Sequence, residues 1–256
     1  MSDKLQYGNW IRWKVLLFLG VGAVGFALLG LCPLPAAARI GAELLSILLF
    51  ISLLYPGILY YMFAPQGGNL QERVYNLIVE ELGGEVDGRA IDIGTGNGIL
   101  AVRLAQEHPL VQVTGLDSWG RDWDYSNPIC ARNARVAGVE QRIRFVKGDA
   151  ARLEFEDGSF DAAVSNLTFH EVKSAPQKRE VVREALRVLK PGGRFVFVDY
   201  FYAEKYYGKT AGFEDFLASQ GLKRMQLKPL SQVLPFPRLL RHPKALGRVG
   251  ILYGVK

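Results

Sequence analysis

Cysteine is scarce in this chain, with only Cys32 and Cys130 among 256 residues. The two lie in very different sequence contexts and have neither the spacing of metal ligands nor the number that a disulfide framework requires. The chain also lacks internal repeats and low-complexity runs. These absences exclude a cysteine-built zinc module, a disulfide scaffold and a solenoid, and no metal site is expected.

The length of 256 residues suffices for one sizeable α/β domain and a smaller additional part. Hydrophobic residues make up 49% of the chain, which is high for a soluble domain and indicates a concentrated apolar segment. The net charge of +6 fits either a nucleic-acid partner or a cytoplasmic face beside anionic lipid.

Two long uncharged runs, residues 15–31 and 44–63, lie near the N-terminus. The second is long enough to cross a bilayer core of about 30 Å, so we expect a pair of spanning helices. No charged residue lies within either run to indicate a transport path. Aromatic residues at the outer ends of the pair are typical of one membrane interface: Trp10, Trp13, Tyr55, Tyr60 and Tyr61.

Positive charge is unequal on the two sides of the predicted hairpin. Lys4, Arg12 and Lys14 precede the first run, whereas the connection, residues 32–43, contains only Arg39. The positive-inside rule then predicts a two-pass protein of the inner or cell membrane, with both termini and the C-terminal domain in the cytoplasm. The predicted parts are an N-terminus (1–14), a transmembrane hairpin (15–63), a connector (64–69) and a domain (70–256).

A secretory signal peptide is an alternative interpretation of the first run. The sequence Ala-Ala-Ala at residues 36–38, after Pro35, resembles a cleavage site. The second run would still anchor the cleaved chain, so the hairpin is the preferred prediction.

Residues 90–98, with the sequence Ala-Ile-Asp-Ile-Gly-Thr-Gly-Asn-Gly, organise the C-terminal domain. The apolar run, the glycines and the helical pattern after them predict a buried strand, a tight turn and a helix. Glycine lets the backbone approach a ligand, and the helix N-terminus offers N–H groups to an anion. A dinucleotide fingerprint would need glycine where Ile99 stands, which disfavours a nicotinamide cofactor.

Helical and strand patterns alternate through the domain. This alternation predicts an α/β fold with a doubly wound, mostly parallel sheet. The predicted helices are 70–82, 99–107, 128–137, 177–189 and 213–221, and the predicted strands are 90–93, 111–116, 143–147, 160–166, 194–199 and 250–255.

Polar residues follow several of these strands. Asp117 ends the second strand, Asp149 follows the third, and Asn166 ends the fourth with His170 and Glu171 close behind. An open α/β sheet binds its ligand at the carboxyl ends of its strands, so these side chains are expected around one crevice.

In order and spacing, these motifs resemble those of class I S-adenosylmethionine (SAM) methyltransferases. The glycine turn, Asp117, Gly148-Asp149, the strand 160–166 and the run Leu-Lys-Pro-Gly-Gly at 189–193 carry the resemblance. It covers residues 70–256 and implies a Rossmann-like, seven-stranded sheet with SAM as cofactor. The sequence is most similar to the small-molecule and lipid-quinone branch.

The resemblance also implies roles. The glycine turn would hold the methionine end of SAM, Asp117 the ribose hydroxyls, and Asp149 with the adjoining backbone the adenine. Trp119, Trp123 and Tyr125 either wall this pocket or simply pack. The predicted cofactor-binding residues are Asp92, Gly94, Thr95, Gly96, Gly98, Asp117, Ser118, Trp119, Asp149, Ala150 and Asn166.

Methyl transfer requires an oriented nucleophile and, where needed, removal of its proton. His170 is the best-placed candidate base and Glu171 the second, while a structural histidine is the alternative.

A late segment, residues 227–248, mixes apolar and basic residues with four prolines. It suits either contact with anionic headgroups or a solvated cover over the final strands.

The sequence therefore predicts a membrane-anchored SAM-dependent methyltransferase acting on a lipid, a lipid-quinone or another hydrophobic small molecule. Methylation of a membrane protein and a non-catalytic SAM-binding scaffold are the alternatives. A nucleic-acid substrate is not expected, because no Asn/Asp-Pro-Pro-aromatic motif follows the fourth strand.

Overall fold

The structure is a computed structural model that describes residues 4–120, 125–243 and 245–256. The chain forms two compact units. One comprises Gly8–Glu72, and the other joins Met1–Tyr7 to Arg73–Lys256. The short N-terminal segment therefore belongs with the large C-terminal unit.

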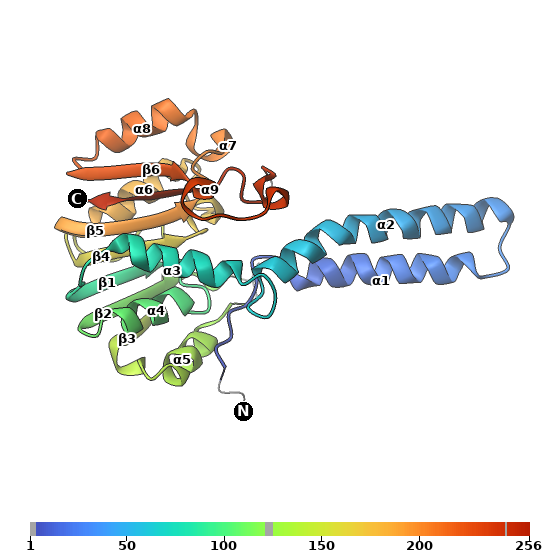
Figure 1. Cartoon of the computed structure of the whole chain (residues 1–256), viewed down its shortest axis with the longest axis horizontal. Coiled ribbons are helices and arrows are strands. Elements are labelled where there is room, and N and C mark those ends of the chain that lie inside the picture. The colour runs from blue at the N-terminus through green and yellow to red at the C-terminus, as the bar shows by residue number, and fades with distance from the viewer. Residues whose placement is uncertain (1–3, 121–124, 244) are drawn as a thin grey trace. The chain divides into compact units, whose positions relative to one another are not determined.

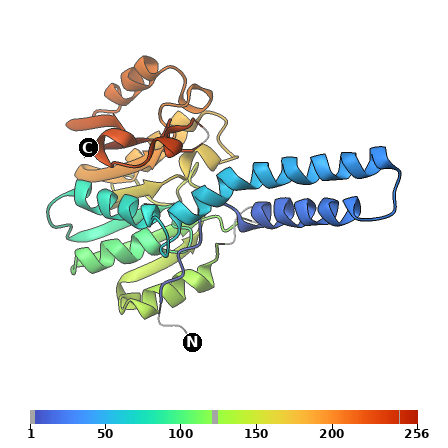
Figure 2. The ribbon, with the colours of Figure 1, turned by 45° about the vertical axis from the view of Figure 1, so that its right-hand side comes forward.

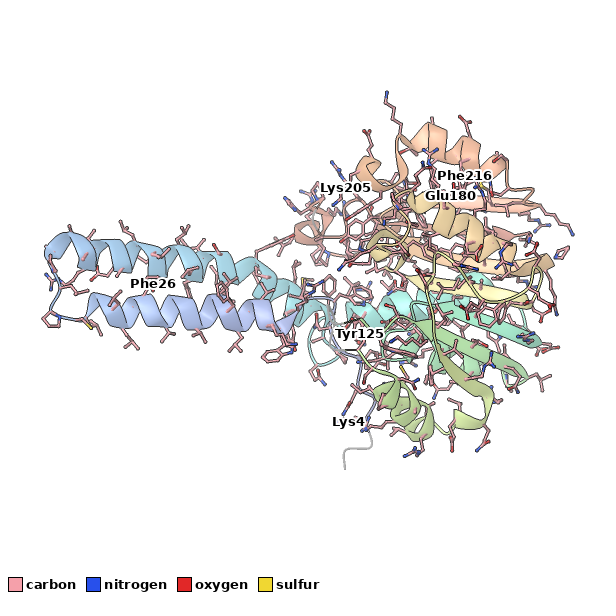
Figure 3. All side chains as sticks on the ribbon, turned by 180° about the vertical axis from the view of Figure 1, so that it is seen from behind. Lys4, Phe26, Tyr125, Glu180, Lys205 and Phe216 are labelled. Atoms are coloured by element: carbon pink, nitrogen blue, oxygen red, sulfur yellow. The ribbon has the colours of Figure 1, made fainter. Side chains whose placement is uncertain are left out.

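The smaller unit consists mainly of helices α1 (Trp13–Gly30) and α2 (Ala36–Phe63). Both are long and apolar enough to cross a membrane, with mean hydropathies of 1.9 and 2.0. Their side chains project outward along both helices (Figure 3). The pair packs closely where residues are small, and the Ser46 hydroxyl donates to the Ala23 carbonyl at 2.7 Å.

Helix α2 begins at Ala36, earlier than the predicted start at residue 44. Pro35, at φ −51°, is the N-cap, and the alanines that follow are strong helix formers. The alanines that resemble a cleavage site are thus the first turn of a helix.

The larger unit is built on a seven-stranded sheet with the order β3-β2-β1-β4-β5-β7-β6. The pairs β5–β7 and β7–β6 are antiparallel, and the neighbouring strands from β3 to β5 are parallel. This is the fold of class I methyltransferases, as predicted. The strands are β1 (Gly88–Ile93), β2 (Val111–Asp117), β3 (Ile143–Lys147), β4 (Phe160–Asn166), β5 (Leu189–Asp199), β6 (Arg224–Pro229) and β7 (Gly250–Val255).

Helices cover both faces of the sheet (Figures 1 and 2). On one face, α6 and α8 join a buried cluster with Ile91 and Ile93 of β1 and Phe195 and Phe197 of β5. The opposite face carries α3, α4 and α5 (Figure 1). The helices of this unit are α3 (Leu70–Leu82), α4 (Ile99–Glu107), α5 (Asn127–Val136), α6 (Lys178–Arg187), α7 (Glu204–Tyr207), α8 (Thr210–Ala218) and α9 (Leu230–Val233).

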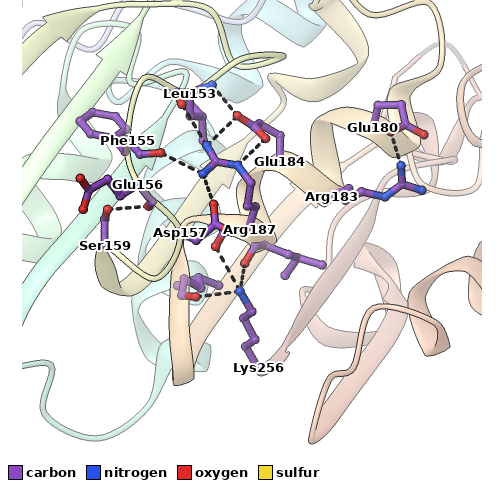
Figure 4. A network of polar contacts seen from close by, with 12 residues as sticks. Leu153, Phe155, Glu156, Asp157, Ser159, Glu180, Arg183, Glu184, Arg187 and Lys256 are labelled. Atoms are coloured by element: carbon purple, nitrogen blue, oxygen red, sulfur yellow. Dashed lines mark hydrogen bonds and ion pairs between the residues drawn. The ribbon is translucent and has the colours of Figure 1, made fainter.

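The end of α6 is fixed by a polar network (Figure 4). The Arg187 guanidinium donates to Glu184 Oε2 at 2.8 Å, to Asp157 Oδ1 at 2.5 Å and to the Phe155 carbonyl at 2.9 Å. Lys256 Nζ donates to the carbonyls of Leu186 and Leu189, each at 2.8 Å. A lysine at this position satisfies carbonyls that the helix end leaves unpaired. The Leu-Lys-Pro-Gly-Gly run follows directly and forms the first residues of β5.

Most predicted elements agree with these bounds, but no range was predicted for α7 or α9, α8 begins at Thr210 rather than residue 213, and two strands differ. The sequence assigned no range to β6, a short edge strand that carries Pro229 and mixes charged with apolar residues. Strand β5 begins at Leu189 rather than residue 194, with a register shift where it pairs Phe160 and Ala162 of β4.

Candidate active site

The predicted site residues gather at the carboxyl edge of the sheet. Register alone places them together, because Ile93 pairs with Leu116 and Ser165, and Asn166 pairs with Val198. The ends of β1, β2, β4 and β5 therefore lie side by side. This is the edge at which an open α/β sheet holds its ligand.

The glycine turn after β1 has left-handed backbone at Gly94, Gly96 and Gly98, with φ of +78°, +57° and +78°. Only glycine adopts these values readily. A Cβ atom on Gly94 would overlap the Thr168 side chain, so the turn and the loop after β4 approach more closely than side chains allow. The predicted turn is confirmed, and each glycine has a backbone reason.

Asp92 stabilises this turn from within. Its side chain is 1% exposed, and Oδ2 accepts hydrogen bonds from the Thr95 hydroxyl at 2.6 Å and the Ala101 N–H at 3.1 Å. Burial raises the pKa of Asp92 to about 7, opposed by these two hydrogen bonds. Asp92 and Thr95 thus stabilise the conformation of the glycine turn, which the sequence predicts to bind the cofactor.

Asp117, at the end of β2, lies beside the same turn. Its Oδ2 accepts from the Gly96 N–H and its Oδ1 from the Trp119 N–H, both at 2.8 Å. Burial raises the pKa of Asp117, against the lowering effect of these bonds. Each carboxylate oxygen can accept more than one bond, so capacity remains for ligand hydroxyls.

Trp119 is held in a left-handed conformation, with φ of +42°. Its indole Nε1 donates to the Gly96 carbonyl at 3.0 Å. A bulky residue in this region is strained, and such strain clusters at ligand sites. Ser118, before it, is exposed, and Trp123 lies outside the described residues.

The loop after β3 reaches the same place. The Gly148 N–H donates to the Asp117 carbonyl at 3.0 Å, and the following Asp149 accepts from the Ala151 N–H at 2.9 Å. Ala150 is buried. The structure thus brings the loop that carries Asp149 and Ala150 to the end of β2, where Asp117 lies.

The end of β4 closes the other side of the turn. Thr168 Oγ1 donates to the Asn166 carbonyl at 3.2 Å and lies 3.5 Å from the Gly94 carbonyl. Leu167 has φ of +53°. Among the described residues, buried Asn166 Oδ1 lacks a hydrogen-bond partner. A ligand donor would satisfy it.

His170 does not stand alone. Its Nδ1 lies 3.0 Å from Oδ1 of Asp199, a fully buried carboxylate at the end of β5. Its Nε2 lies 3.5 Å from Glu171 Oε1. The rings of Tyr200 and Tyr206 flank the imidazole, with centroid distances of 4.7 and 5.4 Å.

These neighbours determine the charge of His170. Burial lowers its pKa, but the charge and hydrogen bond of Asp199, with the nearby Glu171 carboxylate, outweigh burial and raise the pKa to about 10. The imidazole is therefore a cation at neutral pH. A histidine must be neutral to accept a proton as a general base. The positive charge therefore disfavours the base predicted from the sequence and favours a role that uses the charge itself.

Sequence analysis missed Asp199, Tyr200 and Tyr206. Asp199 carried the same signal as Asp117, an acid at the end of a buried strand, and could have been found by it. The tyrosines come close to His170 only through the turn after β5, which sequence spacing does not reveal.

The site fits SAM. Three glycines leave backbone free of side chains, Asp117 offers acceptor capacity for hydroxyls, and Asn166 has an unsatisfied buried oxygen. Donor-rich ligands with a ribose and an ammonium group match these acceptors.

Comparison with known proteins agrees with this geometry. Residues 91–197 match a family model described as a methyltransferase domain. These residues therefore resemble a methyltransferase domain, and this resemblance together with the site geometry indicates SAM as the cofactor.

Two curated relatives are similar over this region. One is 27-O-demethylrifamycin SV methyltransferase of Amycolatopsis mediterranei, 36% identical over 112 residues, covering 44% of this chain and 38% of that protein. The other is demethylmenaquinone methyltransferase of Thermus thermophilus, 34% identical over 115 residues, covering 44% and 47%. The chain thus matches less than half the length of either relative.

Among solved structures, geranyl diphosphate C-methyltransferase from Streptomyces coelicolor, in complex with S-adenosyl-L-homocysteine, has a TM-score of 0.56 at 15% identity. The match covers 74% of this chain and 80% of that one. At this identity the likeness establishes the fold.

Proposed function

We propose that the protein is a membrane-anchored SAM-dependent methyltransferase that methylates a lipid, a lipid-quinone or another hydrophobic small molecule. The observation that carries the proposal is the complete carboxyl edge, where the cofactor turn, Asp117 and the charged His170 stand together. The two curated relatives are named for small-molecule acceptors, one of them a quinone.

SAM, when bound, supplies an electrophilic methyl group on a sulfonium centre. This chain's residues would bind and orient around it. Asp117 would accept the ribose hydroxyls, Asp149 and the Ala150 N–H would hold the adenine, and Asn166 Oδ1 would accept from the ammonium group. Thr168 keeps the loop after β4 against the cofactor turn.

His170 would act through its positive charge. A carbon or oxygen nucleophile becomes reactive as its proton leaves and negative charge develops on it. A preorganised cation beside that charge stabilises it in a low-dielectric site. Glu171, whose side chain is 41% exposed at 3.5 Å from His170 Nε2, is the better candidate to accept the proton.

The N-terminal segment supports the hairpin arrangement. Two residues of α5 bind this segment. Asn133 Oδ1 accepts from the Gln6 N–H at 2.9 Å, and Arg132 Nη1 donates to the Lys4 carbonyl at 3.1 Å. This segment, which precedes α1, is therefore bound to the large unit. In the two-pass anchor that we propose, the positive charge before α1 would lie in the cytoplasm.

Anchoring favours a membrane-dissolved acceptor, because confinement to one surface raises the effective concentration of both partners. The test is transfer of labelled methyl from SAM by the full-length protein in detergent, with a total lipid extract as acceptor. We expect label in the organic phase. Label in the protein fraction would instead favour a membrane-protein acceptor, and SAM binding without any transfer would favour a scaffold.

A further inference from the structure

The charge of the chain is concentrated at its C-terminal end. The last acidic residue is Asp215, and residues 216–256 contain eight lysines and arginines. This region alone exceeds the net charge of +6 of the whole protein. It contains β6, β7 and the loop that joins them, residues 230–249, called here the basic loop.

The basic loop lies at the carboxyl edge of the sheet. It begins after Pro229 and ends before Gly250, and these two residues pair with each other. Gly250 also pairs with Asp199, the partner of His170. The loop therefore leaves and rejoins the sheet at the edge where Asp199 and its partner His170 lie.

The basic loop is folded, with distinct inner and outer faces. Its inner face consists of apolar side chains that are at most 9% exposed: Leu230, Leu234, Phe236, Leu240, Ala245, Leu246 and Val249. Its outer face carries Arg238, Arg241, His242 and Arg248, all exposed, and Leu239, which is 43% exposed. The result is an ordered cationic surface with a protruding apolar side chain.

The basic loop also touches the residue at which the chain leaves the apolar unit. Arg73 Nη2 donates to the Pro235 carbonyl at 2.6 Å. Arg73 directly follows Glu72, the last residue of that unit. In the apolar unit, the segment just before Arg73 is bonded to the end of α2, because the Asn69 N–H donates to the Ala64 carbonyl at 3.1 Å. Because Arg73 directly follows the apolar unit in the chain, a membrane that received α2 would keep the large unit, and the loop with it, tethered to that membrane.

We propose that the basic loop binds the headgroups of anionic lipids and so holds the carboxyl edge of the sheet at the membrane surface. Arginines contact the headgroups, while Leu239 enters the interface below them. This inference rests on the membrane anchoring in the proposed function. It explains how a bilayer-dissolved acceptor reaches His170 without crossing water.

A nucleic acid is the other polyanion that such charge attracts. Single-stranded binding relies on exposed aromatic side chains for stacking. The loop's one Phe, Tyr or Trp residue is Phe236, which is 6% exposed. An exposed leucine beside arginines suits a lipid interface instead.

The test uses the full-length protein in lipid nanodiscs. Leu239→Cys, combined with Cys32→Ser, carries an environment-sensitive fluorophore, while Cys130 is buried and stays unlabelled. In discs containing phosphatidylglycerol we expect blue-shifted emission and quenching by spin-labelled lipid, and neither in discs of phosphatidylcholine alone. Replacing Arg238 and Arg241 by Gln should weaken docking about 30-fold, the equivalent of about 2 kcal/mol.

A matched control removes the same charge at the other end of β6. Lys223→Gln with Arg224→Gln should leave docking unchanged, because both residues lie at the amino edge of the sheet. Three results would overturn the proposal. They are emission that does not depend on lipid charge, equal losses of docking in both double variants, and a response to oligonucleotides rather than to lipid. Failure of the protein to stay with any disc would instead refute the anchoring, and absent methyl transfer with normal docking would refute only the enzymatic proposal.

Discussion

The imidazole of His170 and the carboxylate of Asp199 form an ion pair, with 3.0 Å between Nδ1 and Oδ1. The Asp199 side chain is almost fully buried, and its Oδ1 also accepts from the Tyr200 N–H at 2.6 Å. A buried carboxylate that is aligned in this way holds one ring nitrogen of the histidine and keeps the ring charged. Nε2 faces Glu171, at 3.5 Å from its Oε1.

Asp199→Asn should therefore lower the pKa of His170 from about 10 towards or below 6.5. A histidine with a raised pKa stabilises the fold fully below pH 6.5, and this contribution is lost as the pH rises through 10. NMR of the imidazole Cε1 proton checks the prediction. The wild-type resonance should not titrate between pH 6 and 8, and a midpoint in that window would contradict the ion pair.

His170→Gln should slow turnover about 10²- to 10³-fold, the usual effect of removing one group that stabilises developing negative charge. SAM affinity should change little, because His170 lies on the acceptor side of the site. Steady-state kinetics and calorimetric titration separate the two effects. Glu171→Gln provides the comparison, because loss of a base should move the pH dependence of kcat, and an unchanged profile would remove Glu171 as the proton acceptor.

Asp117→Ala should weaken SAM binding about 10- to 100-fold, as expected for hydrogen bonds to a charged group. The variant also leaves the Gly96 and Trp119 N–H groups without their acceptor. Calorimetric titration with SAM measures the loss. Asp157→Ala is the control, since that carboxylate is 80% exposed in the network around Arg187, away from the turn. Equal affinity in wild type and Asp117→Ala would refute the ribose assignment.

Gly94→Ala and Gly138→Ala separate backbone strain from steric overlap. Both glycines have left-handed backbone, at φ of +78° and +68°. A Cβ at Gly138 meets nothing within 4 Å, whereas one at Gly94 overlaps Thr168. Gly138→Ala should cost about 1–2 kcal/mol of stability and leave SAM affinity intact. Gly94→Ala should cost more and also impair SAM binding; thermal unfolding and titration that fail to distinguish the two variants would contradict the close approach.

The sequence was sufficient for most of the sheet and for the glycine turn. The apolar run at residues 195–198 indicates a buried strand, and the turn at Gly94–Gly98 has a glycine at every second position. Strand β6 was not predicted because this edge strand has no continuous apolar run. The surroundings of His170 escaped because Asp199 lies 29 residues away in sequence and meets it only across paired strands.

The protonation of His170 was also beyond the sequence. A histidine in isolation titrates near neutral pH and invites assignment as a base. Its charge here depends on the buried Asp199 carboxylate and the nearby Glu171 carboxylate, which the folded edge brings to the ring. The same holds for the basic loop, whose arginines point outward only because its apolar residues pack inward.

The most direct test of the proposed function is mass spectrometry of a total lipid extract incubated with SAM and the full-length protein, compared with the Asp117→Ala variant. The account predicts a lipid-soluble species that gains one methyl group with the wild-type protein and forms far more slowly with the variant. An extract left unchanged by a wild-type protein that binds SAM would contradict it.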